Sequence, residues 1–160
     1  MNRFGKASVI ALGVLALGTA VASAQSAADA VSARQAAMKT FGPDSKAIGD
    51  YAKGMGDKAA AAKAASDMAA TAAKLETLWP AGTSSTDMPG VSHAKAAIWT
   101  DHDAFVAKFA AMADSANKLS GVIASGAPAD VQAAFGDFGK TNCGACHSMY
   151  REAPPPKPQG

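Results

Sequence analysis

The 160-residue sequence contains only two cysteines and few aromatic residues, and its positive and negative charges nearly balance. Both cysteines stand in one short motif, so we expect no structural disulfide. A formal net charge of +2 provides no basic stripe, which argues against a nucleic-acid partner. No stretch alternates apolar and polar residues with a period of two, and this argues against β-strands.

Alanine is abundant instead, which predicts an all-α protein. We expect four helices. The first covers about 29–41, with a break or kink at Gly42-Pro43 and a continuation toward residue 54. The second covers 57–78 with Asp57 as N-cap, the third 98–123, and the fourth runs from about 129 through the two cysteines. Four amphipathic helices predict an antiparallel four-helix bundle.

Residues 1–24 have the features of a cleaved export signal. Arg3 and Lys6 precede an uncharged, largely apolar stretch, and Ala22-Ser23-Ala24 matches an A-x-A cleavage site. The stretch is shorter than the about 20 residues that a membrane-spanning helix needs, and no later segment is apolar enough. Cleavage would leave 13 of the 15 basic residues against 13 acidic ones, so the mature chain would be neutral.

The mature chain is predicted to form one domain over residues 25–153, followed by a disordered proline-rich tail over 154–160. Within the domain, residues 80–97 are rich in Gly, Pro, Ser and Thr and form a long connection. Loops of this length are uncommon in compact domains, so we expect this one to cross between non-adjacent helix ends or to cap a site. Its polarity predicts that it is exposed.

The sequence Cys143-Gly144-Ala145-Cys146-His147 is a C-x-x-C-H motif, which is typical of covalent haem attachment. Residues three apart share a helix face, so Cys143 and Cys146 could bond the two vinyl groups of one porphyrin. His147 could then ligate the iron. A redox dithiol and a zinc site are the alternatives, but the first needs a preceding strand and the second needs more ligands.

The sequence resembles the class II c-type cytochromes, the cytochrome c′ family. The resemblance covers the mature chain and rests on three segments: residues 143–151 with the motif, residues 34–39 of the first helix, and Ile98-Trp99. It implies a four-helix bundle in the periplasm with one haem c, bound through Cys143 and Cys146. It also implies that His147 ligates the iron and that a first-helix residue covers the opposite face.

Met38 is the residue that matches this first-helix position. The resemblance implies two classes: low-spin members with a methionine as sixth ligand, which transfer electrons, and five-coordinate members that bind nitric oxide or carbon monoxide. A thioether is a good haem ligand, so we expect Met38 to ligate the iron and the protein to be an electron carrier. The alternatives are that Met38 only packs in the core, and that the protein binds a gas.

Other side chains have weaker assignments. Arg34 could bind a haem propionate or lie exposed, and the resemblance implies that Arg151 shields the proximal imidazole. Lys140 could help to dock a partner or be solvated. His102 is expected at a core or boundary position, with a minor alternative as an iron ligand, and His93 in an exposed loop. Met68 and Met112 are expected in the core.

No paired carboxylates or nucleophile–base arrangement accompany the motif, so we do not expect an enzyme. The expected partners are periplasmic redox proteins, and the resemblance is compatible with a homodimer.

Covalent attachment of haem can be tested directly. The mature protein is expected to have the mass of the polypeptide from Gln25 plus one haem, and the haem should survive acid–acetone extraction, because thioether bonds resist it. Replacing Cys143 and Cys146 together by alanine should abolish covalent haem in the mass spectrum. Covalent haem in this double variant would contradict the assignment.

Overall fold

The computed structural model describes the backbone of residues 18–153 and the side chains of residues 27–153. The predicted export signal, residues 1–24, lies outside the residues with described side chains, and its cleavage stays a prediction. The predicted tail, residues 154–160, lies outside the described residues altogether.

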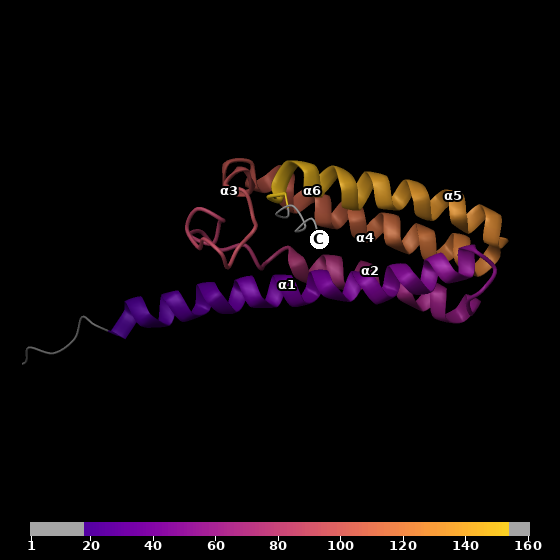
Figure 1. Cartoon of the computed structure of the whole chain (residues 1–160), viewed down its shortest axis with the longest axis horizontal. Helices are drawn as coiled ribbons and strands as arrows, with labels where there is room; N and C mark the ends of the chain where they lie inside the picture. The colour runs from indigo at the N-terminus through magenta and orange to yellow at the C-terminus, as the bar shows by residue number, and fades with distance from the viewer. Residues whose placement is uncertain (1–17, 154–160) are drawn as a thin grey trace, which may run out of the picture.

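The described residues form a bundle of antiparallel helices (Figure 1). Its elements are α1 (Gly18–Ala52), α2 (Lys58–Leu75), α3 (Ala97–Thr100), α4 (His102–Ser125), α5 (Pro128–Phe138), a π-helical segment η1 (Gly139–Gly144) and α6 (Ala145–Tyr150). Helix α2 packs on α1 and α4, and α5 packs on α4 and α1, which closes the ring. The predicted all-α four-helix bundle is therefore confirmed. No helix among residues 18–153 has the length and apolarity to cross a membrane.

The predicted break at Gly42-Pro43 is wrong, because α1 continues through both residues. A proline inside a helix costs about 3 kcal/mol. Phe41 packs against the core just before the proline, and Ile48 is fully buried after it. Burying a large apolar side chain contributes about 1.5–3 kcal/mol, so packing on both sides offsets the cost of the proline.

Helix α2 begins as predicted, since the carboxylate of Asp57 accepts a hydrogen bond from the N–H of Ala60 at 2.7 Å. Its buried face consists mainly of alanine: Ala61, Ala64, Ala65, Ala69 and Ala72. Small side chains allow neighbouring backbones to approach closely, and α2 uses this face against α1 and α4.

The predicted third helix is interrupted. Asp101 adopts φ −125° and ψ 45°, which ends α3 and starts α4 at the next residue. Beyond this point the helix buries a seam of side chains spaced by three or four residues: Phe105, Phe109, Met112, Ala116, Leu119 and Ile123. His102 is exposed, so its predicted core or boundary position is wrong. The helical spacing that placed His102 on the same face as Phe105 does not hold across the break at Asp101.

The predicted fourth helix contains a π-helical segment that includes the first cysteine. The N–H of Ala145 donates to the carbonyl of Lys140, five residues earlier. Thr141 Oγ1 donates to the carbonyl of Asp137 at 2.8 Å, and Asn142 Nδ2 to that of Phe138 at 3.2 Å. Side chains that bond back to the preceding turn distort helices, which explains why the wider turn forms here.

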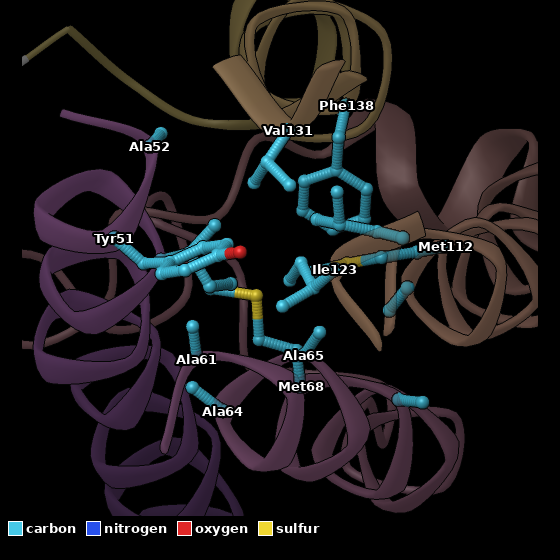
Figure 2. Packing of buried hydrophobic residues seen from close by; sticks show 14 of the residues in the cluster. Tyr51, Ala52, Ala61, Ala64, Ala65, Met68, Met112, Ile123, Val131 and Phe138 are labelled. Atoms are coloured by element: carbon cyan, nitrogen blue, oxygen red, sulfur yellow. The ribbon is translucent and has the colours of Figure 1, made fainter. Parts of the chain in front are cut away.

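Two apolar clusters follow one another along the bundle. The first is rich in alanine, and Figure 2 shows Tyr51, Met68 and Ile123 of this cluster meeting between the helices. The second is made of larger side chains: Leu75, Ile98, Phe105, Phe109 and Tyr150. Met68 and Met112 belong to the first cluster, so their prediction as core residues is confirmed.

The close packing of α2 makes a testable prediction. Ala65 is fully buried, so Ala65→Leu should lower the free energy of unfolding by about 1–3 kcal/mol, because the added carbon atoms have no space. Ala73→Leu on the exposed face of the same helix should change it by less than about 0.5 kcal/mol. Urea unfolding followed by circular dichroism measures both. Equal losses in the two variants would contradict the close packing.

Candidate haem site

The bundle opens at the end that carries α3 and α6, and a cavity of about 490 Å³ lies there. Helix α1 lines it with Arg34, Gln35, Met38 and Lys39. Another wall comes from the end of α6, with Cys146, His147 and Tyr150, followed by Arg151. The remaining lining comes from α3, α4 and the connection before them. The cavity therefore joins the first helix to the cysteine motif, which lie far apart in the sequence.

Aromatic rings form the apolar side of this cavity. Trp79 meets Phe105 edge to face, with ring centroids 4.7 Å apart, and stacks on Phe109 at 5.9 Å. Tyr150 meets Phe105 from α6, at 4.9 Å. The Tyr150 hydroxyl donates to the carboxylate of Asp101 at 3.3 Å, at the break between α3 and α4. These contacts bring the end of α6 against α3 and α4 and provide an apolar wall.

The two cysteines face different surroundings. Cys146 lines the cavity and packs against the aromatic cluster, whereas Cys143 packs against the alanine-rich cluster and does not line the cavity. We expected both on one face from their helical spacing, and the π-helical turn that includes Cys143 changes this spacing. Both thiols are free and half-buried.

The thiols do not have the properties of a redox dithiol or a zinc site. Burial raises the pKa of Cys143 and of Cys146, whereas reactive cysteines have lowered pKa values. Residues 18–153 contain no β-strand, only an isolated bridge between Ala94 and Arg151, so the strand of a thioredoxin-like site is missing there. No three His, Cys, Asp or Glu residues gather in the described part of the chain to hold a metal ion.

His147 has the environment of a neutral imidazole. Partial burial lowers its pKa, and the positive charge of Arg151 lowers it further. The neutral ring is the form that binds a metal. Arg151 also pairs its backbone with Ala94 and lines the same cavity as His147, and its shielding of the imidazole stays a prediction.

Met38 is half-buried on α1 and packs against the aromatic cluster. It lines the same cavity as His147, from a different helix. This is the arrangement that a ligand or a cover for the second face of the iron requires. Ligation itself stays a prediction.

Arg34 is buried, with 4% of its surface exposed, so the alternative of an exposed head is wrong. Its guanidinium donates to Thr83 Oγ1 at 2.9 Å, to the carbonyl of Thr83 at 2.6 Å and to Ser92 Oγ at 2.8 Å. It also lies over the ring of Trp79, 4.5 Å from the centroid. Because these hydrogen bonds use the two Nη atoms, contact of Arg34 with a haem propionate stays a prediction.

The connection between α2 and α3 is less exposed than its polarity predicted. Thr83, Ser84 and Ser92 are buried, with 0–3% exposed surface. Arg34 bonds the first and third of these, and the carboxylate of Asp87 accepts hydrogen bonds from Ser84. The sequence contained no signal for the burial of Thr83 and Ser92, because their partner is an arginine on another helix, far away in the sequence.

The remaining candidates lie elsewhere or were missed. His102 and Lys140 are exposed and do not line the cavity. His93 is exposed as predicted, but it does line the cavity. It is held there because its carbonyl accepts from the N–H of Glu152 at 2.8 Å, a long-range pairing that the sequence does not indicate.

Comparison with known proteins decides the family. A family model described as Cytochrome C′ matches residues 29–151. The chain belongs to the cytochrome c′ family. It is 39% identical over 114 residues to cytochrome c′ from Cereibacter sphaeroides, which is 69% of this chain and 72% of that one.

Solved structures of cytochromes c′ agree with this. The cytochrome c′ from Rhodobacter sphaeroides has a TM-score of 0.70 and 32% identity, and covers 80% of this chain and 98% of its own. A nitric oxide complex of a variant cytochrome c′ from Alcaligenes xylosoxidans has a TM-score of 0.65 and 29% identity, covering 78% and 95%. As a cytochrome c′, the chain binds one covalent haem c, and Cys143 and Cys146 stand in the attachment motif.

The residues around the cavity fit this group. The rings of Trp79, Phe105 and Phe109 suit an apolar macrocycle, and Cys146 and His147 line the same cavity and would hold it. Basic side chains line the cavity, and no carboxylate among the described residues does, which suits the two acidic propionates of haem.

The role of His147 can be tested by substitution. His147→Ala should keep covalent haem but shift the Soret band and the midpoint potential, because the neutral imidazole that faces the cavity is lost. His93→Ala and His102→Ala serve as controls, since both are exposed histidines and the first also lines the cavity. Absorption spectra and redox titration measure the effect. A His147 variant with unchanged spectrum and potential would show that another group is the proximal ligand.

Proposed function

We propose that this cytochrome c′ binds a small diatomic gas, nitric oxide or carbon monoxide, at the haem face that Met38 covers. The observation that carries the proposal is the cavity itself, in which Met38 and His147 stand on different helices around an apolar wall. Haem supplies an iron centre that binds such a gas when one axial position is open. The protein supplies the proximal imidazole and the shape and polarity of the other side.

The relatives support this choice over the electron carrier that we expected from the sequence. The family match and the relatives above are cytochromes c′, and one of them is a nitric oxide complex. The apolar rings around the cavity favour an uncharged ligand, because burial of a polar or charged one without partners is costly.

An electron-transfer protein with His147 and Met38 as axial ligands is the second candidate. One observation favours it: Met38 is the only methionine that lines the cavity within the described part of the chain. A thioether ligand raises the potential of haem and favours ferrous iron, which suits an electron carrier. The same side chain therefore separates the two functions, according to whether its sulfur binds the iron or only packs beside it.

The cellular setting belongs to the proposal as well. The sequence features of an export signal support a periplasmic location, and haem c attachment requires the exported chain's two thiols to be free. We propose periplasmic redox proteins as partners that reduce the iron. Pairing into a homodimer stays a prediction from the family resemblance.

The spin state of the unmodified protein separates the two functions. For gas binding, we expect a broad, high-spin spectrum of the ferrous protein and direct uptake of carbon monoxide or nitric oxide. Met38→Ala should then speed uptake and leave the spin state unchanged, because it only removes a covering side chain. Narrow low-spin bands in the unmodified protein, lost in Met38→Ala together with a fall in potential, would instead establish ligation by Met38.

Met149→Ala is the matched control for this experiment. Met149 is 51% exposed on α6, two residues after His147, and does not line the cavity. Its removal should change neither the spin state nor the rate of gas binding. A change as large as that of Met38→Ala would show that the effect does not come from the cavity.

A further inference from the structure

Arg34 is a buried charge whose partners in the protein are all neutral. Its side chain is almost fully buried, and every hydrogen-bond acceptor that contacts it is neutral: a carbonyl or a hydroxyl. The ion pairs among residues 27–153 do not include it. Buried charges are usually paired, because moving a charge out of water is costly.

The charge persists at neutral pH. Burial lowers the pKa of Arg34 to about 10, which still leaves the guanidinium protonated at pH 7. Trp79 and Trp99 lie within 4.5 and 6.0 Å of the guanidinium carbon, and their rings attract a cation. The site therefore holds a fixed positive charge in a region of low polarity, where electrostatic interactions act over longer distances than in water.

This charge belongs to the same cavity as the haem motif. Arg34 lines the cavity together with Cys146 and His147, and it lies one helical turn before Met38 on α1. Its position is fixed from outside the helix, since Thr83 and Ser92 hold both Nη atoms. A flexible surface lysine would be screened by solvent and salt, whereas Arg34 is neither mobile nor exposed.

We propose that Arg34 is an internal positive charge of the haem site that favours ferrous over ferric iron. This inference rests on the placement of the haem in the cavity. Ferric haem carries one more positive charge than ferrous haem, so a fixed cation nearby disfavours the ferric state and raises the midpoint potential. If Arg34 also pairs with a propionate, its removal leaves that negative charge unbalanced, and the direction of the effect is the same.

The proposal gives Arg34 a function beyond anchoring the connection. A ferrous site is the form that binds carbon monoxide, and it binds nitric oxide tightly, so a raised potential keeps the protein ready for its proposed ligand. The connection then acts as the support that holds the charge in place.

Two substitutions separate the effect of the charge from that of the side-chain shape. Arg34→Lys keeps the charge but loses the planar set of guanidinium N–H donors, and Arg34→Gln loses the charge.

The test is the midpoint potential of the haem-loaded full-length protein, after its mass has shown one covalent haem. Arg34→Gln should lower the ratio of ferrous to ferric haem at a given applied potential about tenfold or more. This corresponds to a fall in the midpoint potential of about 59 mV for one electron. Arg34→Lys keeps the charge, so its midpoint potential should fall by no more than half as much as that of Arg34→Gln. The shift should persist in 1 M salt, because the Debye length falls to about 3 Å there but a buried charge is screened little.

Lys39→Gln is the matched control. Lys39 lines the same cavity and belongs to the same helix, but it is exposed. Its removal should produce a smaller shift that disappears in 1 M salt. An unchanged potential in Arg34→Gln, an equal shift in Arg34→Lys, or a shift that vanishes in high salt would each overturn the proposal.

Thr83→Asp decides the question if Arg34→Gln does not fold. Thr83 Oγ1 accepts from Arg34 Nη1 at 2.9 Å, so a carboxylate there pairs with the guanidinium and cancels its charge while the arginine stays. The potential should fall as in Arg34→Gln, and an unchanged potential in this variant would overturn the proposal. If the mass of the unmodified protein shows no covalent haem, the haem site itself is wrong, and this result is known before any potential is measured.

Discussion

The change in side-chain size along the bundle determines where this protein has a site. The first cluster is built from alanines of α2 that face α1 and α4, and they allow the helices to pack closely. The second cluster contains the larger side chains of Phe105, Phe109 and Tyr150. The cavity lies against this second cluster, and all three of these side chains line it. The haem motif lies at the open end.

The open end is stabilised by contacts that are not part of the helix packing. Arg34 connects α1 to the loop between α2 and α3, through Thr83 and Ser92. On its other side this loop pairs with the chain just after α6, where Lys95 N–H donates to the carbonyl of Tyr150 at 2.9 Å. The loop thus holds together the two walls that carry Met38 and His147. Its buried polar groups are satisfied, as expected for a low-polarity region, since no buried side-chain polar atom of the described residues lacks a partner.

The fold could be predicted from local patterns because helices depend on neighbouring residues. The alanine content, the seam from Phe105 to Ile123 and the Asp57 cap each act within a few turns. The errors came where distant contacts outweigh local preference. Pro43 remains in a helix because Phe41 packs against the core before it and Ile48 is buried after it. Thr83 is buried because its oxygen atoms accept hydrogen bonds from Arg34. The C-x-x-C-H motif identified the cofactor, but its spacing did not reveal the π-helical turn.

The pairing of the loop with the end of α6 also affects how the site fluctuates. His93 accepts from Glu152, Ala94 pairs with Arg151, and Lys95 Nζ donates to the carbonyl of Ser148 at 3.1 Å. Breaking these bonds exposes both segments together, so the loop and α6 form one cooperative unit of local unfolding. Because His147 belongs to α6, exposure of its imidazole and loosening of the loop are then the same event. The access of solvent to this side chain is therefore tied to the stability of a polar loop that lies far from it in the sequence.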